Sequence, residues 1–152
     1  MTQQQPQGNG PQIDADFSQI DLVRTPLSKA YPDKELTERV IGAAFEVHRE
    51  LGSGFLERVY EVALLREFAS RGVSAASQVP LPVLYKGTPV GMYYADILVE
   101  KRIILEIKAA TSIESAHEAQ VLHYLTATGL RLALILNFGT PSVQVKRIVK
   151  SK

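Results

Sequence analysis

The spacing of apolar residues changes along the chain, and these changes divide the sequence into predicted elements. Residues 1–34 are rich in Gln, Gly, Pro and Asp at their start and show no helical period. Such a segment buries too little apolar surface to offset its ordering entropy, so we expect a disordered or loosely docked tail. Regular patterns fill residues 35–150, which we expect to form one domain.

Helical spacing comes first. Apolar residues recur three and four positions apart from about Leu36, and Thr37 is a candidate N-cap. The run Gly52–Gly54 ends this helix. A second helix is predicted from about Leu56 to Ser70, with Gly72 placed to terminate it.

The period then shortens to two, which is typical of strands. One more helix interrupts this part, over residues 113–128, with Ser112 as its cap. Pro80 and Pro82 place the first strand at a sheet edge, because proline cannot donate to a ladder. The predicted order is α-α-β-β-β-α-β-β, with strands over residues 78–85, 90–99, 103–109, 130–138 and 143–149.

Composition limits the choice of function. The 152 residues are 45% hydrophobic and 22% charged, an ordinary globular balance that suits a single domain with a small core. Lys and Arg number 17 against 16 Asp and Glu, a formal net charge of +1. A protein so nearly neutral must bind any nucleic acid through a local patch.

The chain has no cysteine, which excludes disulfides, thiolate catalysis and cysteine-ligated zinc. This absence fits a reducing compartment. No apolar run approaches the roughly 20 residues of a membrane span, and residues 1–10 do not resemble a secretory signal. We therefore expect a cytoplasmic protein.

Three ionisable residues interrupt the most apolar predicted hairpin. If its turn centres on Lys101, Asp96 lies opposite Glu106 on one face, and Lys108 shares that face two residues further on. Two neighbouring carboxylates repel each other unless a cation or a shared proton relieves them. Mg²⁺ would do so, and the lysine would then lie ready to stabilise a phosphate oxygen.

An alternative reading of the same spacing is a structural salt bridge. Lys108 would pair with one of the two acids on a solvated sheet face, as antiparallel sheets often have one polar face. Spacing alone does not decide between these readings.

Further motifs bear on the choice. Residues 54–60 read G-x-x-E-x-x-Y, residues 93–96 read Y-x-A-D, and residues 106–108 read E-x-K. Residues 117–125, H-E-A-Q-V-L-H-Y-L, are followed by N-F-G at 137–139. Together these motifs resemble the bacterial GxxExxY protein family of the PD-(D/E)XK nuclease-like superfamily, over roughly residues 36–149.

The resemblance implies a fold and a site. The fold is α/β (α+β), a restriction-endonuclease-like core with a mixed sheet of about four to five strands flanked by helices. Asp96, Glu106, Lys108 and Glu57 match the catalytic positions, and the three acids match the ligands of Mg²⁺ or Mn²⁺. Ala95 stands where many members have a proline.

Other residues are candidates for binding substrate or supporting the site. They are Gln120, Tyr124, His117 and Tyr60, the last of which could equally be a packing aromatic. His48 is expected to be structural. A basic rim for phosphate is also conceivable, with a solvated face as the alternative, from Lys101, Arg102, Arg131, Lys146, Arg147, Lys150 and Lys152.

The activity that the resemblance implies is metal-dependent hydrolysis of phosphodiester bonds in DNA or RNA. Two alternatives keep the fold without autonomous catalysis: a nucleic-acid- or protein-binding module, and a subunit of a larger defence, repair or mobile-element complex. Because so small a domain lacks a separate recognition surface, a homodimer is expected to supply it.

Overall fold

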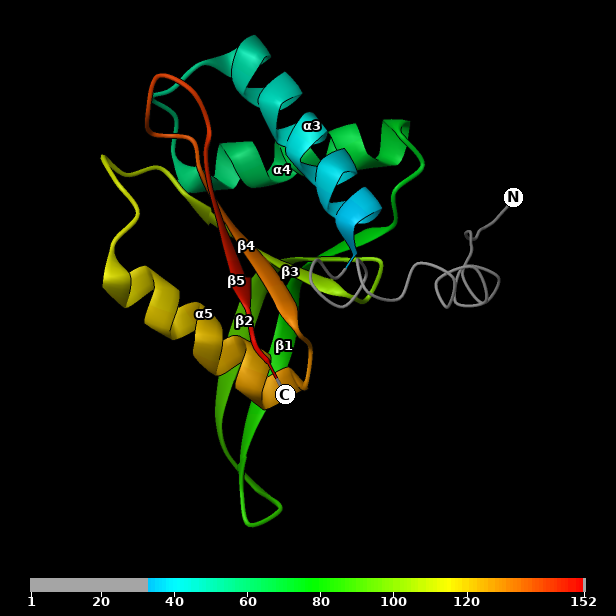
Figure 1. The fold of residues 1–152 in the computed structure, drawn as a ribbon, viewed down its shortest axis with the longest axis vertical. Helices are drawn as coiled ribbons and strands as arrows, with labels where there is room; N and C mark the ends of the chain where they lie inside the picture. Colours follow the sequence, from blue (N-terminus) through cyan, green and yellow to red (C-terminus); the bar gives the residue numbers. More distant parts are fainter. Residues whose placement is uncertain (1–32, 152) are drawn as a thin grey trace.

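The computed structural model describes residues 33–151 as one arrangement of three helices and five strands, in the predicted order (Figure 1). The predicted tail, residues 1–34, lies outside the described residues except for Asp33 and Lys34. The helices are α3 (Lys34–Leu51), α4 (Glu57–Ser70) and α5 (Ser115–Thr128). The strands are β1 (Ala75–Tyr85), β2 (Thr88–Val99), β3 (Ile103–Lys108), β4 (Leu132–Asn137) and β5 (Gln144–Val149).

The strands form one mixed sheet in the order β1-β2-β3-β4-β5. Only β3 and β4 are parallel, and α5 provides the crossover that parallel neighbours require. The mixed sheet flanked by helices confirms the predicted fold class. The prediction from Pro80 and Pro82 is also correct, since β1 is an edge strand.

A three-residue turn, Glu100–Arg102, sets the register between β2 and β3, since Val99 pairs with Ile103. Glu100 and Lys101 both have left-handed backbones, with φ of 52° and 58°. The Arg102 N–H donates to the Val99 carbonyl at 2.8 Å, and Ile97 pairs with Leu105. The predicted centre of the turn at Lys101 is thereby confirmed.

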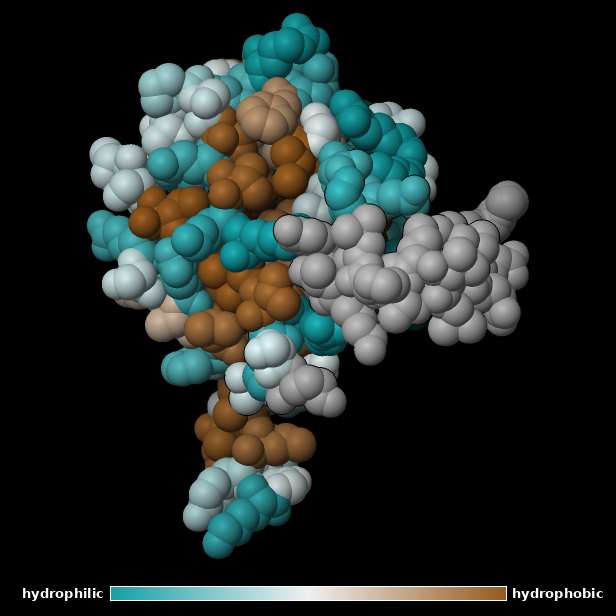
Figure 2. All heavy atoms as spheres, in the orientation of Figure 1, coloured by the Kyte–Doolittle hydropathy of each residue, from teal (hydrophilic) through white to brown (hydrophobic). Residues whose placement is uncertain are grey.

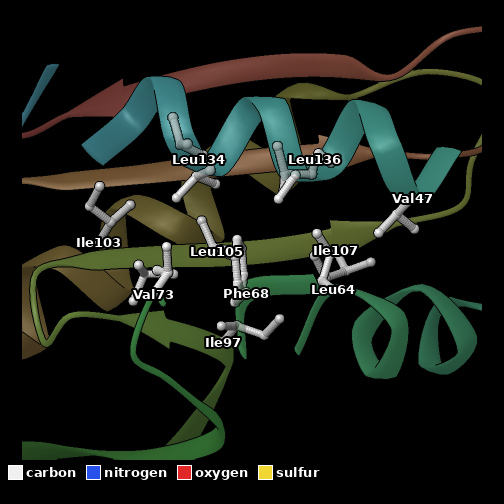
Figure 3. Packing of buried hydrophobic residues seen from close by; sticks show 14 of the residues in the cluster. Val47, Leu64, Phe68, Val73, Ile97, Ile103, Leu105, Ile107, Leu134 and Leu136 are labelled. Carbon is white, nitrogen blue, oxygen red and sulfur yellow. The ribbon is translucent and has the colours of Figure 1, made fainter. Parts of the chain in front are cut away.

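Two apolar layers hold the helices to the sheet. On one face, α3 and α4 pack through residues such as Val47, Leu64 and Phe68 against alternate side chains of β2, β3 and β4 (Figure 3). On the other face, Val121 and Leu125 of α5 pack against the remaining alternate positions. Strands β3 and β4 are buried on both faces, as a central parallel pair must be.

Two predicted helix caps are wrong. Thr37 lies within α3, which begins at Lys34, and its N–H donates to the Asp33 carbonyl at 2.8 Å. Helix α5 starts at Ser115 rather than after Ser112, with Glu114 as its N-cap. There Glu114 and His117 form a reciprocal capping box, so a carboxylate and an imidazole cap the helix instead of a hydroxyl.

A buried amide fastens the end of β4 to the connection that follows β3. Asn137 is fully buried, and its Oδ1 accepts from the N–H groups of Ala110 at 2.9 Å and Gly139 at 3.1 Å. Its Nδ2 donates to the Ala110 carbonyl at 3.0 Å and to Gln144 at 2.9 Å. The N-F-G turn therefore fixes the ends of β3 and β4 relative to each other.

Gly139 is required by this close approach. A Cβ at this position would lie 2.6 Å from the backbone nitrogen of Ala110, so Gly139→Ala must displace backbone. We expect it to lower the free energy of unfolding by about 1–3 kcal/mol. Gly91→Ala is the matched control, because its Cβ meets nothing nearer than 3.9 Å. Urea unfolding of both variants measures the difference; equal midpoints would contradict the expectation.

Candidate functional site

The candidate site lies where β2 separates from β3. The two strands pair only from Ile97 to Val99, whereas β3 continues to Lys108 beside β4. Asp96 is the first residue of β2 beyond this pairing. Its Oδ2 accepts a hydrogen bond from the Ile107 N–H at 2.8 Å, so a side chain replaces the strand as the partner of β3. The separation leaves Glu106 and Lys108 of β3 with β4 on one side and no strand on the β2 side.

Glu106 is the most constrained of these groups. It is 7% exposed, and its Oε1 is buried without a hydrogen-bond partner in the described part of the chain. Burial, followed by the charge of Asp96, raises the pKa of Glu106 to about 8. The pKa of Asp96 is also raised, chiefly by burial and against the effect of its bond to Ile107. The register that places Ile97 opposite Leu105 brings these two carboxyl groups together, as the spacing predicted.

Lys108 completes the trio. Its Nζ lies 3.7 Å from Oε2 of Glu106, and its side chain is 17% exposed. This distance is within ion-pair range but too long for a strong hydrogen bond. The ammonium therefore only partly offsets the paired acids, and it remains accessible from the end of β3.

Glu57 affects Asp96 and Glu106 from helix α4. It is the first residue of α4, and its charge raises the pKa of both Asp96 and Glu106. It also lines an open cleft of about 560 Å³, bounded by residues 53–57, residues 109–111 and Gly139. Of the predicted site residues, Glu57 is the one that lines this cleft, which borders the carboxyl end of β3.

Sequence reasoning missed Glu61, a buried acid one turn after Glu57. Glu61 is 5% exposed, pairs with Arg58 at 2.9 Å, and accepts from the Gln78 amide at 3.1 and 3.3 Å. Gln78 has a left-handed backbone, φ 50°, and the β1–β2 ladder skips it together with Asp96 opposite. The available signal in the sequence was the spacing of Glu57 and Glu61, because two residues four apart lie on one face of a helix.

Tyr124 is brought to the site from α5. It is 4% exposed, and burial together with the charges of Glu106 and Asp96 raises its pKa to about 12. Its ring lies 5.3 Å from that of Tyr93. The phenol thus lies near both acids, on the face of the sheet that α5 covers.

Gln120 and His117 are placed differently from Tyr124, although the three share a predicted stripe on α5. Gln120 is exposed. His117 is half-buried, and its Nδ1 accepts from the Glu114 N–H at 3.1 Å as part of the helix cap. Their predicted roles beside the site stay predictions.

Tyr60 is fully buried and positions the loop before α4. Its hydroxyl donates to the Gly52 carbonyl at 2.6 Å and accepts from the Phe55 N–H at 3.2 Å. Its ring stacks on Phe138 at 4.5 Å. His48 stacks on the same Phe138, and its Nε2 lies 2.9 Å from the carbonyl oxygen of Thr140. Tyr60 and His48 therefore support the loops around the cleft from within the core.

The register separates most of the predicted basic rim from the acids. Ile103 pairs with Leu132 and Leu132 with Val149, so Lys101, Arg102, Arg131 and Lys150 lie at the opposite end of β3 from Lys108. From Ile103 to Lys108 the strand advances by five residues, which separates the two ends by about 16 Å. Lys146 lies nearer Glu106, because it pairs with Ile135, the β4 partner of Glu106. Its Nζ is 3.9 Å from a carboxylate oxygen of Glu118 on α5. Lys152 lies outside the described residues.

The residues present fit a cation that keeps most of its own water. Among residues 33–151, no three His, Asp or Glu side chains lie close enough to hold a metal as a group. Mg²⁺ binds through as few as one or two carboxylates, completed by waters and substrate phosphates. Asp96 and Glu106 offer such a pair, and Oε1 of Glu106, which has no hydrogen-bond partner among residues 33–151, is free to be a ligand.

The chain is similar to known proteins in sequence and, more distantly, in structure. The model of the PD-(D/E)XK nuclease superfamily matches residues 34–148. No curated protein matches. A solved structure, the crystal structure of SSO0001, matches at 18% identity and a TM-score of 0.48. The match covers 85% of this chain and 62% of that one, so this chain spans less than two thirds of the length of the solved structure.

None of the helices in residues 33–151 is long and apolar enough to cross a membrane.

Stability without metal should depend on the charge of Glu106. Between pH 4.5 and about 8 the folded protein holds a proton on Glu106 that the unfolded chain has released, so stability falls as pH rises through this window. The loss is a few kcal/mol, with about 5 kcal/mol as a ceiling at about 1.4 kcal/mol per pKa unit.

Urea unfolding in a chelator at pH 6 and pH 8.5 tests this expectation. Glu106→Gln, which removes the titrating group and keeps its shape, should show a clearly smaller loss between the two values. Equal losses in wild type and variant would show that Glu106 does not control the pH dependence.

Proposed function

The chain belongs to the PD-(D/E)XK nuclease superfamily, and from that premise we propose that it is a metal-dependent nuclease that hydrolyses phosphodiester bonds of DNA or RNA. Within the superfamily, its G-x-x-E-x-x-Y and E-x-K motifs support membership of the GxxExxY family. A chain without cysteine suits action in the cytoplasm.

One observation carries the proposal. Glu106 is a carboxyl group buried beside Asp96; within the described part of the chain one of its oxygens has no partner, and the Lys108 ammonium lies 3.7 Å from the other. A purely structural salt bridge would satisfy both oxygens, because an unpaired buried oxygen lowers stability. The arrangement is understandable if a divalent cation and its waters normally complete it.

The residues then take distinct roles. Asp96 and Glu106 would hold Mg²⁺ or Mn²⁺, and the Ile107 N–H keeps the Asp96 carboxylate turned toward β3. Lys108 would contact a phosphate oxygen or orient the attacking water. Glu57, at the cleft, would hold an outer water or a second ion.

The bound ion supplies Lewis-acid stabilisation of the phosphate and a lower pKa for its water. In the reaction, the water oxygen bonds to phosphorus, its proton goes to solvent, and the ester oxygen leaves after taking a proton. Tyr124 lies near both acids, and in this proposal its hydroxyl would contact a phosphate of the bound strand.

Metal binding and cleavage should be lost together in site variants. Calorimetry with Mg²⁺ and Mn²⁺ should show binding to wild type, and Glu106→Gln and Asp96→Asn should each weaken it at least about 100-fold. Glu67→Gln is the matched control, since it removes an acid that pairs with Arg71 away from the site. Mg²⁺ should also raise the unfolding midpoint at pH 8.5 in wild type but not in Glu106→Gln.

The same proteins are then incubated with single- and double-stranded DNA and RNA. Cleavage by wild type and by the control, but by neither site variant, is the expected result. Absence of metal binding in wild type would overturn the proposal and leave the acids structural. Binding without cleavage of any substrate would favour a non-catalytic module or a subunit that needs a partner.

A second prediction concerns Gln78. This residue lies opposite Asp96 between β1 and β2, and its amide donates to Glu61. Gln78→Ala should weaken Mg²⁺ affinity roughly tenfold, because it frees the strand segment that positions a ligand. It should also lower the free energy of unfolding by about 1–2 kcal/mol, because buried Glu61 loses the bonds from the Gln78 amide. Ser77→Ala, on the same strand, serves as control. Unchanged affinity in Gln78→Ala would show that the bond from Ile107 alone positions Asp96.

A further inference from the structure

The hairpin of β1 and β2 extends the sheet away from the acids as a nearly uncharged arm. We define the arm as residues 79–95, which project beyond the rest of the fold (Figure 1). Figure 2 shows hydrophobic residues along most of its visible side. The arm contains no Asp or Glu, and its one charged residue is Lys86, at the tip. It therefore offers a nucleic acid neither repulsion nor a row of cations for its phosphates.

The side of the arm that carries Tyr93 is turned toward α5. Ile97 and Ala95 are two residues apart on β2, and in a regular strand their side chains would share one face. Ile97 nevertheless belongs to the apolar layer under α3 and α4, whereas Ala95 belongs to the layer under α5. The change of face occurs at Asp96, opposite the left-handed Gln78 that the ladder skips. The irregularity that presents Asp96 therefore also directs the arm toward α5.

Tyr93 connects the arm to the acids. Its ring centroid lies 5.3 Å from that of Tyr124, whose phenol lies near Glu106 and Asp96. Tyr93 keeps 38% of its surface exposed, whereas Tyr124 keeps only 4%. From Tyr93 to Asp96 the strand advances by three residues, about 10 Å. An exposed aromatic ring thus lies within reach of the nucleotides next to a phosphate held at the acids.

We propose that Tyr93 stacks on an unpaired base of the substrate, so that the site takes single-stranded DNA or RNA. This inference rests on the proposed nuclease activity, for which it names the substrate class. An aromatic ring stacks on any base whose face is free, which is a common way to bind single strands. A duplex covers the faces of its bases and presents mainly phosphates and groove edges. A nearly uncharged arm has little with which to bind those groups.

Charge and space around the site favour the arm as the path of the strand. On the α4 side, a polyanion that leaves the acids meets Glu57, which is exposed at the start of α4. The arm carries no acid. Gly91 follows Tyr93 on the same side of β2, opposite Val83, and a Cβ at Gly91 would meet nothing nearer than 3.9 Å. A base stacked on Tyr93 therefore has room beside it and meets no negative charge.

Binding in a chelator tests the contact without requiring cleavage. The probes are fluorescein-labelled oligothymidylate and oligouridylate of about 20 nucleotides and a DNA duplex of the same length, followed by fluorescence anisotropy. Wild type should bind at least one single strand more tightly than the duplex. Tyr93→Leu should weaken that binding about 5- to 100-fold, the effect of losing one stacked base. Tyr93→Phe keeps the ring and should bind within about threefold of wild type.

Tyr94→Leu is the matched control. Tyr94 is the next residue along β2, is 53% exposed, and pairs with Pro80 on the other side of the arm. This variant should bind the single strand as tightly as wild type, and circular dichroism checks that each variant folds. Equal weakening by Tyr93→Leu and Tyr94→Leu overturns the proposal. Equal affinity of wild type for single strands and duplex overturns it too, as does a Tyr93→Phe variant as weak as Tyr93→Leu.

A second measurement uses the absence of tryptophan from the chain. Tyr93→Trp places a single indole at the proposed contact, and Tyr94→Trp places it on the other side of the arm. Because stacking on a base quenches indole fluorescence, the bound oligonucleotide should quench Tyr93→Trp and leave Tyr94→Trp unchanged. No quenching of Tyr93→Trp, or equal quenching of both variants, overturns the proposal.

Cleavage in Mg²⁺ separates this inference from the proposed function. In a cleaving wild type, Tyr93→Leu should raise KM for the single strand more than it lowers kcat, because a binding contact is lost. Cleavage with an unchanged KM in Tyr93→Leu would keep the nuclease and overturn the stacking contact. Single-strand binding that depends on Tyr93, without cleavage, would support the stacking contact and count against the activity alone.

Discussion

The candidate site depends on the point at which β2 leaves β3. If β2 and β3 stayed paired beyond Ile97, the backbone of Ala95 and Asp96 would continue the ladder. Glu106 would then be flanked by β2 on one side as well as by β4 on the other. Instead the Asp96 carboxylate accepts the Ile107 N–H. This single bond satisfies a backbone donor that the departing strand would otherwise leave unpaired. It also turns the carboxylate toward Glu106, so the same feature opens the sheet and assembles the acids.

This arrangement is unfavourable for folding alone. Burial raises the pKa of Glu106 to about 8, and one of its oxygens has no partner in the described residues. An apolar side chain in place of Glu106 would pack more favourably against its neighbours Ile104 and Ile135. A buried charge at this point lowers stability, and the central strands β3 and β4, buried on both faces, offset that loss. The structure around the site therefore supports a chemical role more than an architectural one.

The fold and the placement of Asp96 beside Glu106 were predictable because both follow from local patterns. Alternation and turn residues determined the hairpin, and a turn at Lys101 alone determines that Asp96 faces Glu106. Glu61 was not predictable in the same way, since it contacts Gln78 seventeen residues away through a left-handed backbone. The caps at Thr37 and Ser112 failed because helix ends are decided by neighbouring side chains, here Glu114 with His117. Gln120 and Tyr124 share a stripe in sequence, yet the sheet buries only Tyr124.

Charge distribution limits how the site can attract a polyanion. Lys101, Arg102, Arg131 and Lys150 lie at the far end of the central strands, where their attraction for a phosphate at Lys108 is weakened over about 16 Å by salt. Close to the acids, the Lys108 ammonium lies 3.7 Å from Glu106, which offsets its charge only when the carboxyl group is ionised. The positive charge that draws a phosphate to this site must therefore be largely local and contributed on binding. In the proposed nuclease, a cation held by Asp96 and Glu106 would supply that charge, so metal and substrate should bind cooperatively.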